Sequence, residues 1–246
     1  MSTAVIDQPA ADANPAVDEG ALTLAAERLG VEESRIANAS GDVTWDEWAG
    51  SYDANGRICE FVDGLLLEKS VGAEESGLAA KLLTLLENAN EQLRAATKAE
   101  DPPYHLLTGD GAVKVGRNGR VPDLSVLAMA AWKAAEGRRK VAPPPILAVE
   151  VLSESNTARE MRQKRRDYFG AGVEEAWFAD PEGLTVEVWT DEKKPVVYGV
   201  DDAVPCDRLF PGLRVPVKDW LEGRLTRRAA ELLDSMDAGT PKEVSR

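Results

Sequence analysis

The stretch Ile146–Leu152, which reads ILAVEVL, constrains the fold more than any other part of the chain. Six of its seven residues are apolar, and four of them precede its single carboxylate, Glu150. A short, nearly all-apolar run is typical of a β-strand that is buried on both faces. Such a strand belongs in the middle of a covered sheet, so the chain is expected to form an α/β domain.

The segments around this strand favour the same fold class. Leucines and alanines at helical spacing predict a helix over residues 74–96, and Ser155-Asn156-Thr157 predicts the start of a second helix ending near Phe169. The pair Asp63-Gly64 between two apolar stretches predicts a β-hairpin. Further strands are expected at residues 104–107, 112–115, 120–127, 176–179, 184–190 and 196–200. This order of elements predicts a central mixed β-sheet flanked by helices.

The formal net charge of −14 argues at first sight against a nucleic-acid partner, because carboxylates repel phosphates. The acidity is concentrated near the N-terminus, however. The first 60 residues carry three basic and twelve acidic residues, and the remaining 186 carry 26 basic and 31 acidic residues. Basic residues cluster between Lys114 and Lys140 and again between Arg159 and Arg166. Local charge governs the encounter with a polyanion more than total charge does, so nucleic acid stays open as a partner.

Composition along the chain suggests three parts. Residues 1–20 are rich in Ala, Asp and Pro without periodicity, which is typical of a disordered tail, and residues 21–39 fit a short amphipathic helix. We therefore expect an acidic tail with a short helix in residues 1–40. Residues 41–222 are expected to form the main domain, and residues 223–246 a polar helix and tail.

The cysteine count and the N-terminal sequence indicate in which cellular compartment the protein is expected. Cys59 and Cys206 cannot build a disulfide framework, and neither has the spacing of a metal site. The N-terminus lacks the basic and apolar regions of a secretory signal, and no apolar run approaches the roughly 18 residues of a membrane span. A cytoplasmic protein is expected. The chain also lacks GxGxxG and GxxxxGK[ST] motifs, so nucleotide binding by those routes has no support.

Two carboxylates stand out by their surroundings. Asp123 lies in VPDLSVL and Glu150 lies in ILAVEVL. A carboxylate in a buried strand is costly unless it is paired or bound to a cation. If the two strands are neighbours, the carboxylates meet, and a divalent cation such as Mg²⁺ or Mn²⁺ would relieve their repulsion. The alternative is that each carboxylate faces water at a strand end or pairs with an arginine.

A third acid and the only histidine are less distinctive. Counting back from Leu78 along the first helix places Glu75 on the sheet-facing side, where an acid is unexpected. The alternative is an ordinary place at the helix N-terminus, which favours acids through the helix dipole. His105 lies in a predicted strand without a partner motif, so a structural role is expected for it.

Lys164 is the cationic candidate. It lies on the helix that follows Glu150, where its charge can stabilise a phosphate that gains negative charge during a reaction. The alternative is a solvated lysine among its basic neighbours. Those neighbours could contact a nucleic-acid backbone, and they are Arg162, Arg165 and Arg166.

Taken together, these motifs resemble a known family. The blocks VPDLSVL and PPPILAVEVLSESNTAREMRQKRRDYFGAGVEEAWFADPEGLTVEVW are similar to the Uma-two family of restriction-endonuclease-like proteins, within the PD-(D/E)XK nuclease superfamily. The upstream CEFVDGLLLEKSVGAEES and the closing DRLFPGLRVP also fit. The resemblance spans most of the chain outside its two ends. It implies a restriction-endonuclease-like core.

The resemblance also implies roles for single residues. Pro122-Asp123 matches the PD element, and Glu150 matches the acid of the (D/E)XK element. Two residues later stands Leu152 where that element has lysine, and in this family the lysine is placed on the next helix, here at Lys164. Glu75 matches the acid that a helix contributes in many such nucleases.

The implied mechanism is metal-assisted hydrolysis of DNA. Asp123 and Glu150 would hold one or two Mg²⁺ (or Mn²⁺) ions, with the carbonyl of Val151 as an additional ligand. Lys164 would orient the attacking water or neutralise the transition state, and Glu75 would order the metal or a water. The family also suggests a homodimer, and the basic residues of the second helix would contact phosphates.

Two other readings stay open. The first is a catalytically degenerate nuclease fold that acts as a binding module, which Leu152 and the acidic surface favour. The second is an unrelated metal-dependent hydrolase acting on small acidic or phosphorylated substrates. A deep closed pocket would favour that hydrolase, whereas nucleic acid requires an open groove lined by Arg162, Arg165, Arg166 and Lys114.

Overall fold

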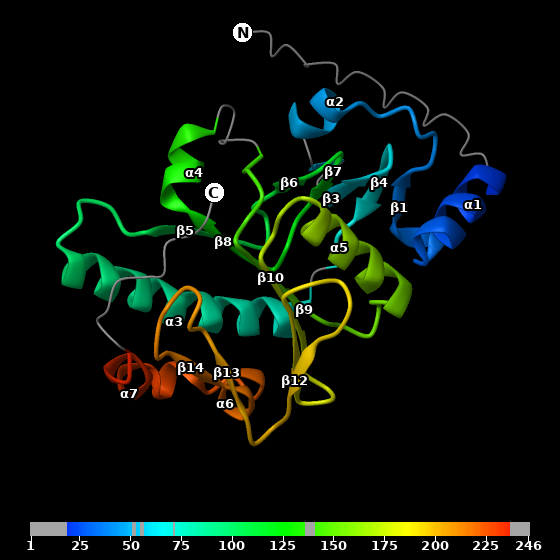
Figure 1. Cartoon of the computed structure of the whole chain (residues 1–246). Coiled ribbons are helices and arrows are strands. Elements are labelled where there is room, and N and C mark those ends of the chain that lie inside the picture. The colour runs from blue at the N-terminus through cyan, green and yellow to red at the C-terminus, as the bar shows by residue number, and fades with distance from the viewer. Residues whose placement is uncertain (1–18, 51–52, 55–56, 71, 136–140, 237–246) are drawn as a thin grey trace, which may run out of the picture.

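A mixed six-stranded sheet forms the centre of the molecule (Figure 1). The structure is a computed structural model, and it describes residues 19–50, 53–54, 57–70, 72–135 and 141–236. The strand order is β12-β11-β10-β9-β8-β5, with β9 and β10 parallel and the other neighbours antiparallel. The strands are β5 Tyr104–Thr108, β8 Leu124–Ala128, β9 Leu147–Val151, β10 Glu175–Asp180, β11 Thr185–Trp189 and β12 Val196–Tyr198. The predicted central mixed sheet is confirmed.

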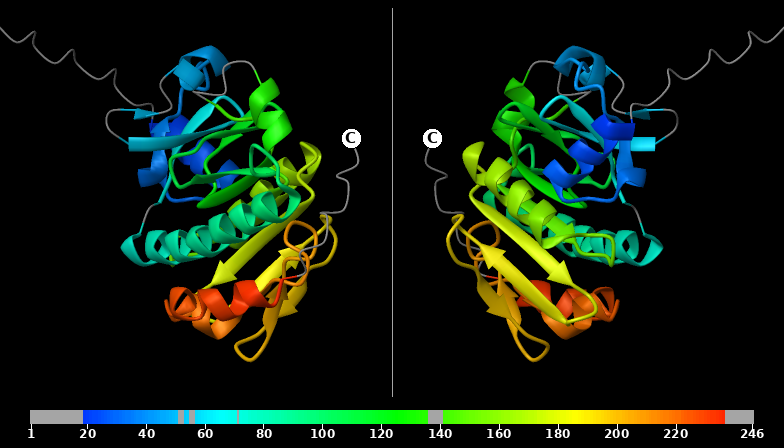
Figure 2. Two further views of the ribbon diagram at one scale, coloured as in Figure 1. Left: turned by 90° about the vertical axis from the view of Figure 1, so that its left-hand side faces the viewer. Right: turned by 90° about the vertical axis from the view of Figure 1, so that its right-hand side faces the viewer.

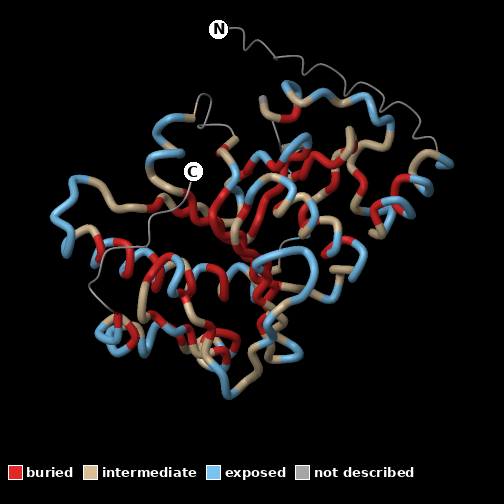
Figure 3. The backbone as a smooth tube through the Cα atoms, viewed as in Figure 1, coloured by how far each residue is buried: buried red, intermediate tan, exposed pale blue. Residues whose placement is uncertain are grey.

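Strand β9 is buried on both faces, as its sequence predicts (Figure 3). Its odd-numbered residues pack with the leucines of α3 (Ala73–Thr97). Ala148, which points the other way, packs with Met161 and Tyr168 of α5 (Ala158–Gly170). The two helices therefore cover opposite faces of the sheet (Figure 2), and Glu150 shares the α5 face with Ala148 because side chains alternate along a strand.

A second sheet carries the predicted hairpin. Strands β3 and β4 are joined by Asp63-Gly64, whose φ angles of 52° and 84° suit the two central positions of a type I′ turn. The order is β1-β4-β3-β7-β6, with β2 paired to β3. Helix α2 (Trp45–Gly50) precedes this hairpin. The strands are β1 Ile36–Asn38, β2 Asp53–Ala54, β3 Arg57–Val62, β4 Leu65–Glu68, β6 Val113–Val115 and β7 Asn118–Arg120.

The single strand predicted over residues 120–127 is wrong, because the chain changes sheets within it. Strand β7 ends at Arg120 in the second sheet, and β8 begins at Leu124 in the central sheet. Pro122 lies in the crossing, where its missing N–H costs no ladder hydrogen bond. Asp123 consequently lies just ahead of β8 rather than inside a strand.

The helix predicted within residues 21–39 occupies only the first part of that range. Helix α1 spans Glu19–Leu29, and a short 3₁₀ turn, Glu33–Arg35, leads into β1. Strand β1 pairs with β4, so this segment joins the second sheet. Residues 1–18, the expected tail, lie outside the described residues.

The C-terminal part packs beneath α3 (Figure 1). Helices α6 and α7 both contact α3. None of the described helices has the length and hydropathy needed to cross a membrane. The domain limits at residues 40 and 222 stay predictions. The remaining elements are α4 Met129–Ala134, β13 Ala203–Pro205, β14 Arg214–Pro216, α6 Val217–Leu221, a 3₁₀ turn Leu225–Arg227 and α7 Ala229–Asp234.

Candidate active site

The two predicted carboxylates lie opposite each other at the end of β9. The antiparallel register of β8 and β9 pairs Leu124 with Val149, and one further step along it sets Asp123 opposite Glu150. Directly opposed residues of an antiparallel pair project from the same face, with Cβ atoms about 5 Å apart. The fold therefore brings Asp123 and Glu150 together on the α5 face of the sheet.

Glu150 is 4% exposed and is held by two side chains of α5. Lys164 Nζ lies 3.0 Å from Glu150 Oε2, and the Tyr168 hydroxyl donates to Oε1. Burial raises the pKa of Glu150, and Asp123 and Glu60 raise it further against the attraction of Lys164. Burial would lower the pKa of Lys164, but Glu150 and Glu60 raise it above its ordinary value. Lys164 is therefore a buried ammonium group.

Asp123 is held by a different set of groups. Lys69 Nζ lies 2.9 Å from Asp123 Oδ1, and the Val151 N–H donates to Oδ2 at 2.7 Å. Lys69 also donates to the carbonyl of Val121 at 2.7 Å, which ties it to the crossing between the sheets. The Asp123 side chain is 15% exposed and that of Glu150 only 6%, so Asp123 is the more accessible of the two carboxylates.

Glu60 and Arg120 complete the surroundings of Lys164, and sequence reasoning missed both. Glu60 Oε1 lies 3.3 Å from Lys164 Nζ and accepts the Val121 N–H at 3.1 Å. Glu60 Oε2 accepts from Arg120 at 2.8 Å. The signal for Glu60 was present: it lies within the apolar run ICEFV, just as Glu150 lies within ILAVEVL. Lys69 and Arg120 carry no comparable pattern.

A cleft of about 1170 Å³ opens beyond the carboxyl end of β9. Residues 152–158, the first turns of α5 and the β10–β11 hairpin line it, and Glu75 comes from the start of α3. The Glu75 carboxylate folds back over Gly72, where a Cβ atom would lie 1.7 Å from Oε2. Among the described residues, no hydrogen bond or ion pair joins Glu75 to Asp123, Glu150 or Lys164. Glu75 thus belongs to the wall of the cleft.

The predicted basic residues divide between the cleft and other surfaces. Arg162 and Arg165 line the cleft, and Arg165 stacks 3.7 Å from the ring centroid of Trp189. Arg166 and Lys114 are not among its lining residues, and Lys114 lies over the Trp45 ring instead. Six acids also line the cleft: Glu74, Glu75, Glu154, Asp180, Glu182 and Glu187. The basic residues 138–140 lie outside the described part of the chain.

The paired carboxylates fit a hard divalent cation by their chemistry. Mg²⁺ is usually bound through one or two carboxylates together with water. Each oxygen of Asp123 and Glu150 accepts one hydrogen bond from the protein and keeps a second lone pair for a ligand. No group of three or more His, Cys, Asp or Glu side chains suited to a metal occurs in the part of the chain that the structure describes. Asp123 and Glu150, which the register of β8 and β9 sets opposite each other, would be the residues to hold such an ion.

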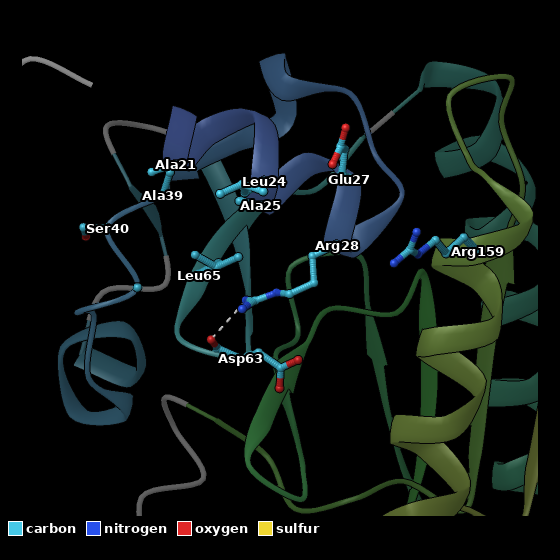
Figure 4. A pocket seen from close by; sticks show the side chains of 11 residues that line it. Ala21, Leu24, Ala25, Glu27, Arg28, Ala39, Ser40, Asp63, Leu65 and Arg159 are labelled. Carbon is cyan, nitrogen blue, oxygen red and sulfur yellow. Dashed lines mark hydrogen bonds between the residues drawn. The ribbon is translucent and has the colours of Figure 1, made fainter. Parts of the chain in front are cut away.

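Two other features lie apart from this cluster. His105 stacks on Trp132 with ring centroids 4.1 Å apart, in keeping with the structural role expected for it. A hollow of about 620 Å³ lies between α1, the Asp63-Gly64 turn and the start of α5 (Figure 4). Arg28 crosses it to donate to the Asp63 carbonyl at 3.4 Å. Neither feature contains a residue of the carboxylate cluster.

Comparison with known proteins places the chain in a family. A search of curated proteins found no match. A crystal structure from Anabaena variabilis ATCC 29413, described as "a putative nuclease belonging to DUF820", shares the fold with a TM-score of 0.59 and 17% sequence identity. The alignment covers 74% of this chain and 99% of that one. The model of the Uma2 (Uma-two) family, described as "Putative restriction endonuclease", matches residues 45–218. Because that match spans most of the chain, the protein belongs to the Uma2 family, as the motifs predicted.

Proposed function

We propose that the protein is a metal-dependent endonuclease that hydrolyses phosphodiester bonds of DNA, with Mg²⁺ or Mn²⁺ held by Asp123 and Glu150. One observation carries the proposal: the opposed carboxylates share their face of the sheet with Lys164, whose Nζ lies 3.0 Å from Glu150 Oε2. Two carboxylates and a lysine suit metal-assisted attack on a phosphate. Membership of a nuclease family supports the reaction class.

The chain's own residues have distinct roles in this proposal. A bound divalent cation would activate a water and stabilise charge on the phosphate. Lys164 supplies a positive charge whose position α5 holds, and its burial strengthens its electrostatic effect. Arg162 and Arg165 contact backbone phosphates from the cleft, without reading sequence. Glu75 orders water from the cleft wall.

Cleavage of supercoiled plasmid and of a labelled single strand tests the proposal, with Mg²⁺, Mn²⁺ or EDTA. We expect cleavage by the wild type with either metal and none with EDTA. Asp123→Asn, Glu150→Gln and Lys164→Met should each lose at least 100-fold in rate, as expected on removing a group that stabilises the transition state. Exposed Asp201→Asn and Lys193→Met are matched controls. Equal cleavage by all these proteins would show that the activity comes from elsewhere.

A binding module without catalysis is the second candidate. It is favoured by the observation that all four oxygens of Asp123 and Glu150 already accept hydrogen bonds within the protein. Titration of the wild-type protein and of Asp123→Asn with Mn²⁺ by calorimetry distinguishes the nuclease from the binding module, because only the nuclease needs Asp123 to bind the metal. A binding module would retain DNA or RNA in a mobility-shift assay without cleaving it, and Asp123→Asn would leave both its Mn²⁺ heat and its nucleic-acid affinity unchanged.

A further inference from the structure

Glu60 touches both halves of the candidate site without being one of its opposed carboxylates. It lies on β3 of the second sheet and is 1% exposed. Its Oε1 accepts the N–H of Val121, two residues before Asp123, and lies 3.3 Å from Nζ of Lys164, the partner of Glu150. A single carboxylate oxygen therefore connects the segment that carries Asp123 with the lysine that contacts Glu150.

Arg120 sets the orientation of the Glu60 carboxylate. Its Nη1 lies 2.8 Å from Glu60 Oε2, and its Nε lies 2.8 Å from Asp167 Oδ2 on α5. Because Arg120 occupies Oε2, the other oxygen of Glu60 stays directed at Lys164. Burial by itself would raise the pKa of Glu60, but Lys164 and Arg120 outweigh burial and lower it to about 2. Glu60 is therefore an anion at neutral pH.

The charges around Lys164 indicate why a second carboxylate is needed. Lys164 is buried, and its two acid partners are Glu150 and Glu60. If a bound divalent cation neutralises the negative charge of Glu150, Lys164 lies beside that cation. Glu60 is then the remaining carboxylate that compensates the positive charge of Lys164. An uncompensated buried ammonium group beside a cation would move away, since a buried charge without a partner is strongly unfavourable.

We propose that Glu60 is a positioning residue of the nuclease site, which holds Lys164 and the segment leading to Asp123 in place while the two opposed carboxylates bind the metal. This inference rests on the proposed function. Glu60 acts through Lys164 and Val121 and has no contact with the substrate. Its loss should therefore reduce kcat and leave the KM for DNA nearly unchanged.

Asp167 provides a matched control. Like Glu60 it is a carboxylate bonded to Arg120, but no described contact joins it to Lys164 or Val121. Asp167→Asn therefore removes a comparable ion pair while leaving the Lys164 contact intact. A purely structural role for this group of charges would make Glu60→Gln and Asp167→Asn equivalent in activity, whereas a positioning role separates them.

The experiment measures kcat and KM on a DNA substrate at saturating Mg²⁺, with thermal unfolding of each variant. We expect Glu60→Gln to lower kcat 10- to 100-fold, the range typical of residues that orient metal-site groups, and to change KM by less than about twofold. Asp167→Asn should retain a kcat within about threefold of wild type. Glu60→Asp, which keeps the charge but shortens the reach to Lys164, should lie between Glu60→Gln and wild type.

Three outcomes overturn the inference. If Glu60→Gln keeps the wild-type kcat while Lys164→Met loses it, Glu60 has no positioning role although the proposed function stands. If Glu60→Gln and Asp167→Asn lose kcat equally, the effect is structural. If Glu60→Gln does not fold, a wild-type kcat for Glu60→Asp decides against the inference. Absence of cleavage by the wild type itself would instead remove the proposed function on which the inference depends.

Discussion

Each of the three acids Glu150, Asp123 and Glu60 at the candidate site has a partner within hydrogen-bond distance. Glu150 accepts from Lys164 and Tyr168, Asp123 from Lys69, and Glu60 from Arg120. Burying a carboxylate is tolerated only when such partners compensate for lost hydration. Removing one partner leaves the carboxylate oxygen that it contacted without a donor. Even the loss of a single hydroxyl here should therefore lower the free energy of unfolding by a measurable amount.

Tyr168→Phe removes one hydroxyl and keeps the ring. The hydroxyl donates to Glu150 Oε1, and Tyr168 is fully buried. Leaving that oxygen without its donor should lower the free energy of unfolding by about 1–3 kcal/mol. Urea denaturation measures the change, with Tyr198→Phe on the edge strand β12 as the control, expected within about 0.5 kcal/mol of wild type. If Tyr168→Phe changes the free energy of unfolding no more than Tyr198→Phe does, the Tyr168 hydroxyl contributes no net stability.

Glu60 should make the free energy of unfolding depend on pH. Its pKa is lowered from 4.5 to about 2 in the folded state, so folding favours the deprotonated form. The resulting stabilisation is present above pH 4.5 and is lost as the pH falls toward 2, about 3 kcal/mol in total. Urea denaturation of wild type and Glu60→Gln between pH 6 and about pH 2.5 measures it. The decline should be shallower in the variant, and parallel declines would contradict the assignment.

At the scale of elements, the unit β9–loop–α5 supplies both the acid and the lysine of the site. Thr157 caps α5 by accepting the Glu160 N–H, which sets where the helix begins. Lys164 and Tyr168 follow at a spacing of four residues, so both lie on the face toward Glu150. The same helix turns Arg162 and Arg165 toward the cleft.

The three arginines of α5 should differ in DNA binding according to whether they line the cleft. Arg162 and Arg165 line the cleft, whereas Arg166 does not. Removing one arginine that binds a phosphate should reduce the slope of log K against log salt by about 0.9 for duplex DNA. We expect such a reduction for Arg162→Gln and for Arg165→Gln, and almost none for Arg166→Gln, in fluorescence anisotropy with Ca²⁺ replacing Mg²⁺. If Arg166→Gln reduces the slope and the other two variants do not, DNA binds outside the cleft.

The packing of α2 on the second sheet depends on a glycine. A Cβ atom at Gly119 of β7 would lie 2.1 Å from the ring of Trp48, which is buried and donates to the Cys59 carbonyl at 2.8 Å. Because the ring is held by that bond, Gly119→Ala should cost about 1–3 kcal/mol through overpacking. Gly170→Ala, which meets nothing within 4 Å, is the control and should be neutral or slightly stabilising. Thermal unfolding separates them.

At the scale of the whole molecule, the N-terminal segment is tied to the main body. Ala25, Ala26 and Leu29 of α1 pack in one cluster with the β3–β4 hairpin. Arg35 Nη1 lies 2.9 Å from Glu160 Oε2 on α5, and Glu160 is 2% exposed. The segment from α1 to Arg35 is thus held by both apolar packing and an ion pair.

Truncation tests how far this segment supports the fold. A chain beginning at residue 41 loses α1 and β1 and leaves Glu160 without Arg35, so it should be destabilised by several kcal/mol, the scale of an unpaired buried charge. A chain beginning at residue 19 retains every described contact and should unfold like the full chain. Urea denaturation of the three chains gives the comparison. If the chain beginning at residue 41 is as stable as the full chain, residue 40 is a true domain boundary.

Several elements and part of the site followed from sequence patterns alone. The apolar run of β9, the leucine spacing of α3 and the Asp63-Gly64 turn each depend on local periodicity or backbone preference. The break at Pro122 escaped prediction because the apolar residues Val121 and Leu124 on either side of it are both buried and suggest one continuous strand. Lys69 and Arg120 escaped it because a charged residue at a strand end carries no pattern of its own.

The sequence by itself determined the mixed α/β fold, the family, and Asp123, Glu150 and Lys164 as candidates. A carboxylate among apolar residues is recognisable without coordinates, Lys164 was found from its place on the helix after Glu150, and the family followed from the combined motifs. Only the tertiary structure decided their partners. Glu60, Lys69 and Arg120 come from the second sheet and its connections, whereas Asp123 and Glu150 are opposed at the central sheet. Polar contacts between residues as far apart as the 61 positions from Glu60 to Val121 depend on how the two sheets pack, and that packing leaves no periodic trace in either strand.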